Sequence, residues 1–211
     1  MDGRSIYVLT GAPLGGKDTV IEYMVKHTFQ GITDTKNSMV LSYSFIDDSK
    51  DRAKLIGIKP EKTPEFRKFL SDDADNMDNF DPENRGYGYR VYRFLNWLDD
   101  NTDERTAAIM VNLRQMKGIV SMGKAVHAKN YRVRILRVDG RGLTPEEMSN
   151  EGDKEYLSWP DDIFHHVFDN SRDLDYRENQ VREFVNKERQ EIADNIAAWN
   201  ETVECVQAAA E

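Results

Sequence analysis

The stretch from Ile6 to Met24, IYVLTGAPLGGKDTVIEYM, decides the fold of this chain. It begins with a short apolar run (residues 6–9) rich in β-forming side chains, which is typical of a strand buried on both faces. Residues 10–16 then contain three glycines and a proline, a composition that ends a strand and favours a tight loop. Beyond Lys17, apolar side chains recur at helical spacing, so the loop leads into an amphipathic helix.

The order strand, glycine-rich loop, helix predicts that this loop binds phosphate. Its pattern is Gly11-x-x-x-x-Gly16-Lys17. Glycines let successive N–H groups converge on an anion, the start of the helix adds a partial positive charge, and Lys17 adds a full one. The loop residues expected to hold a nucleotide in this way are Gly11, Ala12, Pro13, Leu14, Gly15, Gly16 and Lys17. A glycine-rich turn with an exposed lysine is the alternative, and the flanking pattern disfavours it.

Length and composition limit the class of protein. The chain has 211 residues, 39% of them hydrophobic, so we expect a single domain over residues 1–211 with a sizeable core. Cys205 is the only cysteine, which excludes an intrachain disulfide and favours the reducing cytoplasm. A net charge of −9 disfavours duplex nucleic acid as a partner, and no apolar run is long enough for a membrane span.

Apolar runs and helical patterns alternate along the chain. Strands are expected at residues 6–9, 39–46, 107–112, 133–138 and 164–168, with helices between them. This alternation predicts an α/β fold in three layers, in which a five-stranded, mostly parallel sheet carries helices on both faces.

Three segments stand apart from this alternation. Residues 71–90 begin with an acidic stretch poor in large apolar groups, so we expect a mobile surface segment there. We expect this segment to lie beside the binding site of the molecule that accepts a phosphate. Residues 139–162 have low apolar content and are expected to form a lid over an active site. Residues 174–210 are expected to form a long helix, whose final apolar stripe either packs in the core or forms a homodimer contact.

Several polar residues come directly after predicted strands. They lie at Gly11–Thr19, at Asp47, at Asn112–Arg114 and at Asp139–Arg141. Ligands of parallel α/β sheets bind beyond the carboxyl ends of the strands. The sequence therefore predicts one active site that gathers these four places.

Transfer of a phosphoryl group needs positioning and positive charge around the transferring oxygens. Lys17 and the loop amides would hold the β- and γ-phosphates of a nucleotide donor. Arg137 and Arg141 flank the expected lid and would close over those phosphates, which excludes water.

The acceptor needs its own positive groups. Lys50, Arg67 and Arg114 are the candidates for holding its phosphate, because lysine and arginine side chains bind phosphate oxygens. Asp47 would face the acceptor and orient the attacking oxygen or a magnesium-bound water. An N-cap of the following helix is the equally weighted alternative for Asp47.

The loop sequence GAPLGGKDT resembles the nucleoside monophosphate kinase form G-x-P-x-x-G-K-x-T. Its GKDT ending is similar to the phage and bacterial deoxynucleoside monophosphate kinases. Further stretches resemble that family in the same order: SFIDDSK at residues 44–50, KTPEFRKFLS at 62–71, VNLR at 111–114 and FHHVFDNSRDL at 164–174. The likeness spans most of residues 5–185.

The resemblance implies a P-loop kinase fold and transfer of the γ-phosphate of ATP, with Mg²⁺, to a (deoxy)nucleoside monophosphate. It implies that Thr19 bonds a phosphate oxygen, that Asp18 lies near the magnesium ion through water, and that Asn170 borders the donor base. Arg172 would stack on the adenine or lie on the surface. Asn112 stands where the family has an aspartate, and the glycine of the family's N-x-G turn is absent, with Ser171-Arg172-Asp173 in its place.

Two alternatives stay open. One is a P-loop kinase for another small phosphorylated acceptor. The other is a nucleotide-binding sensor or assembly protein with weak or no turnover, which Asn112 and the missing glycine favour.

Overall fold

The computed structural model describes residues 5–29, 39–59, 63–81, 86–103, 106–113, 115–140, 144–148 and 154–191. Within them five strands form one sheet in the order β2-β3-β1-β4-β5, and every neighbouring pair is parallel. The strands are β1 (Ser5–Gly11), β2 (Met39–Ser44), β3 (Thr106–Asn112), β4 (Arg132–Asp139) and β5 (His166–Asp169). The expected parallel sheet is confirmed.

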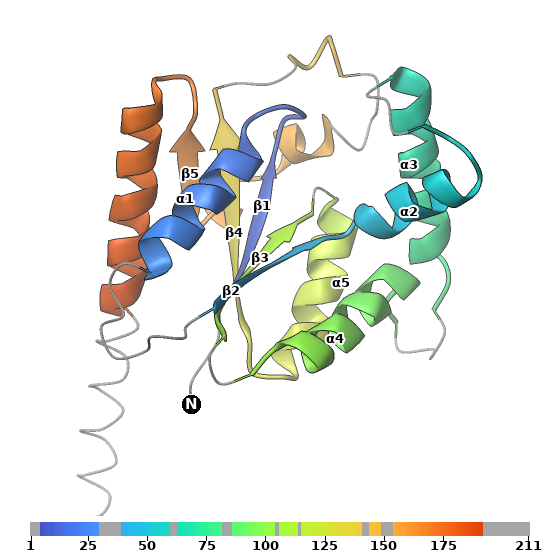
Figure 1. Ribbon diagram of the computed structural model, residues 1–211, viewed down its shortest axis with the longest axis horizontal. Helices are drawn as coiled ribbons and strands as arrows, with labels where there is room; N and C mark the ends of the chain where they lie inside the picture. The colour runs from blue at the N-terminus through green and yellow to red at the C-terminus, as the bar shows by residue number, and fades with distance from the viewer. Residues whose placement is uncertain are drawn as a thin grey trace, which may run out of the picture.

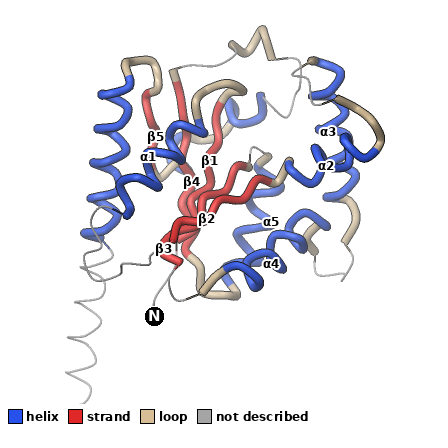
Figure 2. The backbone as a smooth tube through the Cα atoms, viewed as in Figure 1, coloured by secondary structure: helices blue, strands red, loops and turns tan. Residues whose placement is uncertain are grey.

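Helices cover both faces of this sheet (Figures 1 and 2). The helices are α1 (Lys17–Phe29), α2 (Asp47–Leu55), α3 (Pro64–Asp78), α4 (Tyr89–Asn101) and α5 (Met116–His127), followed by a helix over residues 174–191. The fold is therefore the three-layer α/β arrangement that the alternating pattern predicts.

The central strand β1 is buried on both faces. Ile6 and Val8 pack into one core with α4 and α5, whereas Tyr7 and Leu9 pack into a second core with α1 and residues 181–185 of the last helix. Neighbouring strand residues point to opposite faces, which explains the division. This is why the strand is apolar without alternation.

The acidic stretch differs from its prediction. Residues 71–78, expected to be part of a mobile segment, form the second half of α3. Ala74 and Met77 bury one side of these turns, and the side chain of Asp73 on α3 accepts hydrogen bonds from Arg52 on α2. Packing and ion pairs therefore stabilise a helix whose composition alone suggests a loop.

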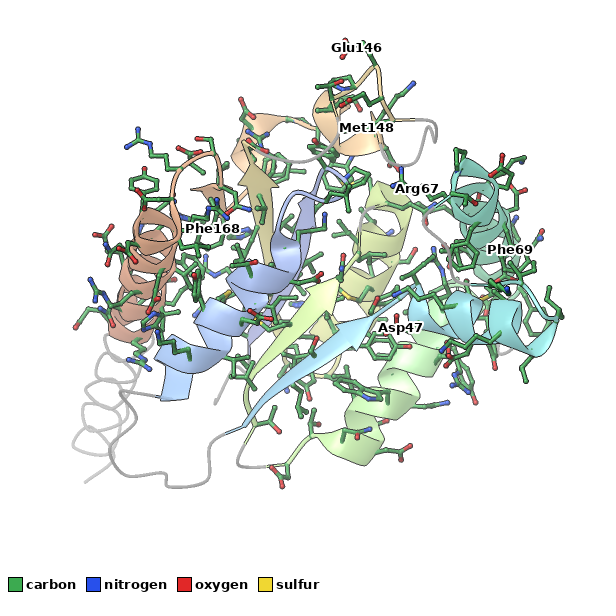
Figure 3. All side chains as sticks on the ribbon, turned by 45° about the horizontal axis from the view of Figure 1, so that its top comes forward. Asp47, Arg67, Phe69, Glu146, Met148 and Phe168 are labelled. Atoms are coloured by element: carbon green, nitrogen blue, oxygen red, sulfur yellow. The ribbon has the colours of Figure 1, made fainter. Side chains whose placement is uncertain are left out.

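The segment expected to be a lid is anchored where the structure describes it. Met148, Tyr156 and Trp159 are buried and belong to the core on the α5 side, while Glu146 lies exposed at the outer edge of this segment (Figure 3). Glu155 accepts a hydrogen bond from the backbone N–H of Met116, the first residue of α5. Two short 3₁₀-helices, Glu155–Ser158 and Asp161–Ile163, complete this stretch.

The last helix is described through residue 191. The apolar stripe that was expected to pack in the core or form a dimer contact lies outside the described residues, as does Cys205. Among the described residues, no helix combines the length and the apolar character needed to cross a membrane.

Phe94 tests the core on the α4 side. It is fully buried, and its ring centroid lies 5.0 Å from that of Tyr43 and 5.3 Å from that of Phe45. Phe94→Ala is expected to lower the free energy of unfolding by about 3–5 kcal/mol, because it removes apolar contacts and leaves a cavity. The matched change Leu55→Ala, at a residue 85% exposed, should cost less than about 0.5 kcal/mol. Urea unfolding followed by circular dichroism measures both, and equal losses would contradict the assigned core.

Candidate functional site

A cleft of about 360 Å³ lies beyond the carboxyl ends of β1 and β3, between the loop that follows β1 and helices α2 and α3. Its walls come from residues far apart in the sequence. They are Pro13, Leu14, Gly15, Gly16, Lys17, Asp18, Phe45, Ile46, Lys50, Arg67, Leu70, Ser71, Ala74, Arg90, Asn112, Leu113 and Gln115. The cleft thus joins the predicted phosphate loop to two of the residues predicted to hold an acceptor.

Two glycines of the loop are required by its geometry. Gly11 has φ +130°, and a Cβ there would lie 2.4 Å from the carbonyl oxygen of Val138 on β4. Gly16 has φ +84°, and a Cβ there would lie 2.0 Å from Nδ2 of Asn170. Both positions combine a left-handed backbone with close contact, which a glycine tolerates and a larger residue does not.

The tip of the loop is a tight turn. The N–H of Gly15 donates to the carbonyl of Ala12 over 3.1 Å, with Pro13 and Leu14 as the central residues. Leu14 has φ +63°, the left-handed region, which costs a non-glycine residue roughly 1–2 kcal/mol. Its side chain lines the cleft and is 57% exposed.

The ammonium of Lys17 lies inside the loop. Lys17 is buried, and its Nζ donates to the carbonyl oxygens of Gly11 over 3.0 Å and Ala12 over 2.7 Å. These carbonyls hold a full positive charge beside the loop amides. A phosphate that enters the loop meets this charge already in place, and Lys17 can exchange carbonyl oxygens for phosphate oxygens.

The side chain of Asn170 supports the loop through a hydrogen bond to its backbone. Asn170 is buried, its Nδ2 donates to the carbonyl oxygen of Gly15 over 2.5 Å, and its backbone N–H donates to the carbonyl of Asp139 over 2.8 Å. Within the described part of the chain, its Oδ1 has no hydrogen-bond partner. Asn170 was expected to border a donor base, and the structure places it in contact with the loop backbone.

Lys50 and Arg67 lie on the opposite wall. Figure 3 shows Arg67 on the side of α3 that faces the loop and the sheet, and Asp47 where β2 meets α2. Nζ of Lys50 lies 2.7 Å from Oδ1 of Asp47, whose side chain is largely exposed. The guanidinium of Arg67 has no ion-pair or hydrogen-bond partner among the residues that the structure describes, so its charge is available to an anion in the cleft.

Asp47 itself does not line the cleft. It is the first residue of α2, whose N-cap is Ile46 without a side-chain cap. Its carboxylate stabilises α2 through the ion pair with Lys50 and through its place in the first helical turn, where a negative charge is favourable.

Sequence reasoning missed a buried polar network in the same cleft. Arg90 on α4 is buried and donates from Nε to Oδ1 of Asp78 over 2.8 Å. It also donates from Nη2 to the second carboxylate oxygen of Asp78 and, over 2.6 Å, to Oε1 of Gln115. Nε2 of Gln115 in turn donates to Asp75 over 3.1 Å. The available signal was an arginine at an apolar helical position, and its partners could not be inferred from spacing.

Arg137, predicted to close over phosphates, lies away from the cleft. It donates to Asp139 and Asp161, each over 2.9 Å, and its guanidinium stands 4.6 Å from the ring centre of Phe164. Burial acts to lower the pKa of Arg137, but the hydrogen bonds and charges of Asp161 and Asp139 outweigh it and raise the pKa. In this conformation Arg137 fastens the expected lid segment to β4.

Three more predicted arginines complete the set. Arg172 is exposed, 3.5 Å from Asp169, with its guanidinium 4.4 Å from the ring centre of Tyr176. Arg114 and Arg141 lie outside the described residues.

The carboxylates near the loop bear on the predicted magnesium ion. Asp18 is exposed and lines the cleft, as does the amide of Asn112 at the end of β3, whereas Thr19 does not line it. Among the described residues, no three or more His, Cys, Asp or Glu side chains form a cluster able to hold a metal ion.

Comparison with known proteins adds little to this geometry. No family model matches the chain, and no curated protein matches it. An unliganded sugar kinase from Janibacter sp. HTCC2649 superposes with a TM-score of 0.44 and 11% identity, over 85% of this chain and 91% of that one. The protein APE1195 superposes with a TM-score of 0.49 and 11% identity, over 91% and 98%. Likeness at this level carries no argument about activity, so the interpretation of the site depends on its own residues.

A pair of glycines tests the loop geometry. Gly16 and Gly57 have almost the same φ, +84° and +80°, but a Cβ at Gly57 would meet nothing within 4 Å. Gly57→Ala should therefore cost about 1–2 kcal/mol of unfolding free energy from backbone strain alone. Gly16→Ala should cost about 1–3 kcal/mol more, because its Cβ overlaps Asn170.

Chemical denaturation of both variants and of the double variant Gly16→Ala/Asn170→Ala measures the difference. The double variant should recover part of the extra loss, since it removes the overlapping amide. Equal losses for the two glycine variants would show that Asn170 does not press on the loop.

Proposed function

We propose that this protein is a phosphotransferase that moves the γ-phosphate of ATP to a (deoxy)nucleoside monophosphate and forms the diphosphate. The observation that carries the proposal is the shared cleft, which is lined both by the glycine loop with Lys17 and by Arg67, whose guanidinium has no partner among the described residues. A site for a polyphosphate and a site for a second anion then share one space, as direct phosphoryl transfer requires.

The loop fits the donor. Gly11 and Gly16 let the loop backbone lie against Val138 and Asn170, where no Cβ would fit, and Lys17 supplies a cation within the turn. The first N–H groups of α1 have no acceptor within the helix and are suited to phosphate oxygens. These groups would hold the β- and γ-phosphates and keep the γ-phosphorus pointed toward the wall that carries Arg67.

The cleft offers fewer suitable groups for magnesium than for the phosphates of the donor. Asp18 is the carboxylate that lines the cleft among the described residues, and it would hold the ion through water, with Thr19 nearby in sequence and the phosphate oxygens completing the shell. When bound, the ion neutralises charge on those oxygens. Asn112 supplies an amide where the resemblance leads one to expect a carboxylate.

The acceptor enters from the α2 and α3 side. An oxygen of its already ionised phosphate attacks the γ-phosphorus, the new P–O bond forms, and the bond to the β–γ bridging oxygen breaks, so ADP leaves with its electron pair. Arg67 and Lys50 would hold the acceptor phosphate in line. Leu70 and Ala74 offer an apolar surface for the rest of the molecule, and Gln115 offers a fixed amide.

One different class of function has a specific observation in its favour. Asn112 lines the cleft as an amide, and Lys17 is already satisfied by loop carbonyls, which suits a nucleotide-binding sensor with weak turnover. A kinase for another small phosphorylated acceptor would use the same cleft. The cytoplasmic location and a homodimer through the last helix stay expectations from the sequence.

Replacing the loop lysine tests the donor site. Lys17→Ala is expected to lower the rate of diphosphate formation by at least about 100-fold, because it removes the cation preorganised at the transferring phosphate. The assay supplies ATP, Mg²⁺ and each common ribo- or deoxyribonucleoside monophosphate and separates the products by chromatography. Lys26→Ala, on the exposed side of α1 and paired with Glu178, should leave the rate unchanged. If wild-type protein binds ATP but phosphorylates no monophosphate, the acceptor is wrong or the protein is a sensor.

Two neighbouring cations on α3 test the acceptor site. Arg67→Ala should raise the KM for the monophosphate about 10- to 100-fold, because a charged hydrogen bond contributes roughly 1.5–3 kcal/mol. Lys68, the next residue, is largely exposed and paired with Asp72, so Lys68→Ala should leave this KM within about twofold. Steady-state kinetics at saturating ATP measures both. Similar shifts in the two variants would mean that Arg67 acts only through overall charge.

A further inference from the structure

Leu14 occupies a turn position that ordinarily belongs to glycine. The turn closes through the hydrogen bond from Gly15 to Ala12, Pro13 is its first central residue, and Leu14 is its second. Turns with proline at the first central position and a positive φ at the second are the type II form, which favours glycine or asparagine there. Leu14 adopts φ +63° although it is neither a glycine nor an asparagine.

The side chain of Leu14 also does nothing for the core. More than half of it is exposed, so it buries little apolar surface, and its backbone is strained. For stability alone a glycine would serve this turn better, since it adopts a positive φ without steric cost. An exposed leucine by itself is unremarkable in a protein, but strain of this kind gathers at functional sites.

The place of Leu14 indicates what its side chain can do. It lines the cleft in the same loop that holds Lys17, and apolar residues of the facing walls, Phe45, Leu70 and Leu113, line that cleft too. With a γ-phosphate held at Lys17 and an acceptor at Arg67, as proposed above, a leucine in this cleft would fill space beside the transferring group. Its methyl groups neither donate nor accept hydrogen bonds, so they cannot orient a water molecule for attack.

We infer that Leu14 is a specificity-determining residue that shields the transferring phosphate from water, so that the phosphate passes to the bound acceptor and not to solvent. The inference rests on the proposed function. Both competing reactions break the same bond between the γ-phosphorus and the β–γ bridging oxygen and release ADP. They differ in the attacking oxygen: the acceptor phosphate gives a diphosphate, and water gives inorganic phosphate, with one proton of the water kept on that phosphate and the other passing to solvent. Leu14 acts by excluding the second nucleophile.

The experiment measures both products from one reaction. Full-length protein is supplied with ATP, Mg²⁺ and the monophosphate that it uses best, and diphosphate and inorganic phosphate are quantified together. Leu14→Ala and Leu14→Gly should each raise the ratio of inorganic phosphate to diphosphate about tenfold, whereas Leu14→Met, which keeps the apolar volume, should leave it near the wild-type value. Leu174→Ala is the matched control, because Leu174 is 58% exposed against 57% for Leu14 and does not line the cleft.

A stability measurement on the same variants separates strain from shielding. Leu14→Ala keeps the left-handed backbone and Leu14→Gly relieves it, so Leu14→Gly should have the higher urea midpoint of the two. The ratio of products should nevertheless rise in both. A rise in only the glycine variant would make the effect one of relieved backbone strain and would overturn the inference.

The outcomes distinguish this inference from the proposed function. If wild-type protein forms diphosphate and the ratio is unchanged in both truncated variants, the shielding role is wrong and the phosphotransferase stands. If wild-type protein forms no diphosphate from any acceptor, the proposed function fails and the inference fails with it.

Discussion

The structure depends on the close approach of one loop to the carboxyl end of the sheet. Gly11 lies against the backbone of β4, and Gly16 lies against the buried amide of Asn170, both at distances that leave no room for a Cβ. Asn170 in turn hydrogen-bonds the loop carbonyl of Gly15 and the last residue of β4. The loop therefore keeps its shape because three separate segments of the chain converge on it, and the charge of Lys17 is held inside that shape.

Ion pairing sorts the arginines of the cleft region into different roles. Arg90 is saturated by Asp78 and Gln115, and Arg137 is saturated by Asp139 and Asp161, so both act as fixed parts of the protein. Arg67 faces the cleft without such partners among the described residues. A guanidinium that already pairs with carboxylates attracts an anionic ligand less strongly than a guanidinium whose charge is uncompensated. This difference gives the two walls of the cleft distinct chemistry, a positive anchor on α3 and a rigid polar surface beside α5.

Local sequence patterns predicted most of the fold, because most of its strands, loops and helices are determined by residues close together in the sequence. The apolar run of β1, the glycines of the loop and the helical spacing after Lys17 each follow from short-range rules. The helical turns at residues 71–78 did not follow, because their stability comes from burial of Met77 and from the ion pair between Arg52 and Asp73 on another helix. The burial of Arg90 could not be foreseen for the same reason. Its partners lie 12 and 25 residues away in sequence.

The sequence by itself determined the class of fold, the position of the glycine-rich loop and the two glycines at its ends, since backbone conformation and side-chain periodicity depend on residues close together in the sequence. It also predicted Lys50 and Arg67 as residues that hold an acceptor phosphate, and this role stays a prediction. Only the tertiary structure decided that Arg67 and the loop share one cleft, that Asn170 supports the loop, and that Leu14 lines the cleft in a left-handed turn. These are relations between segments brought together by packing, and spacing along the chain carries no record of them.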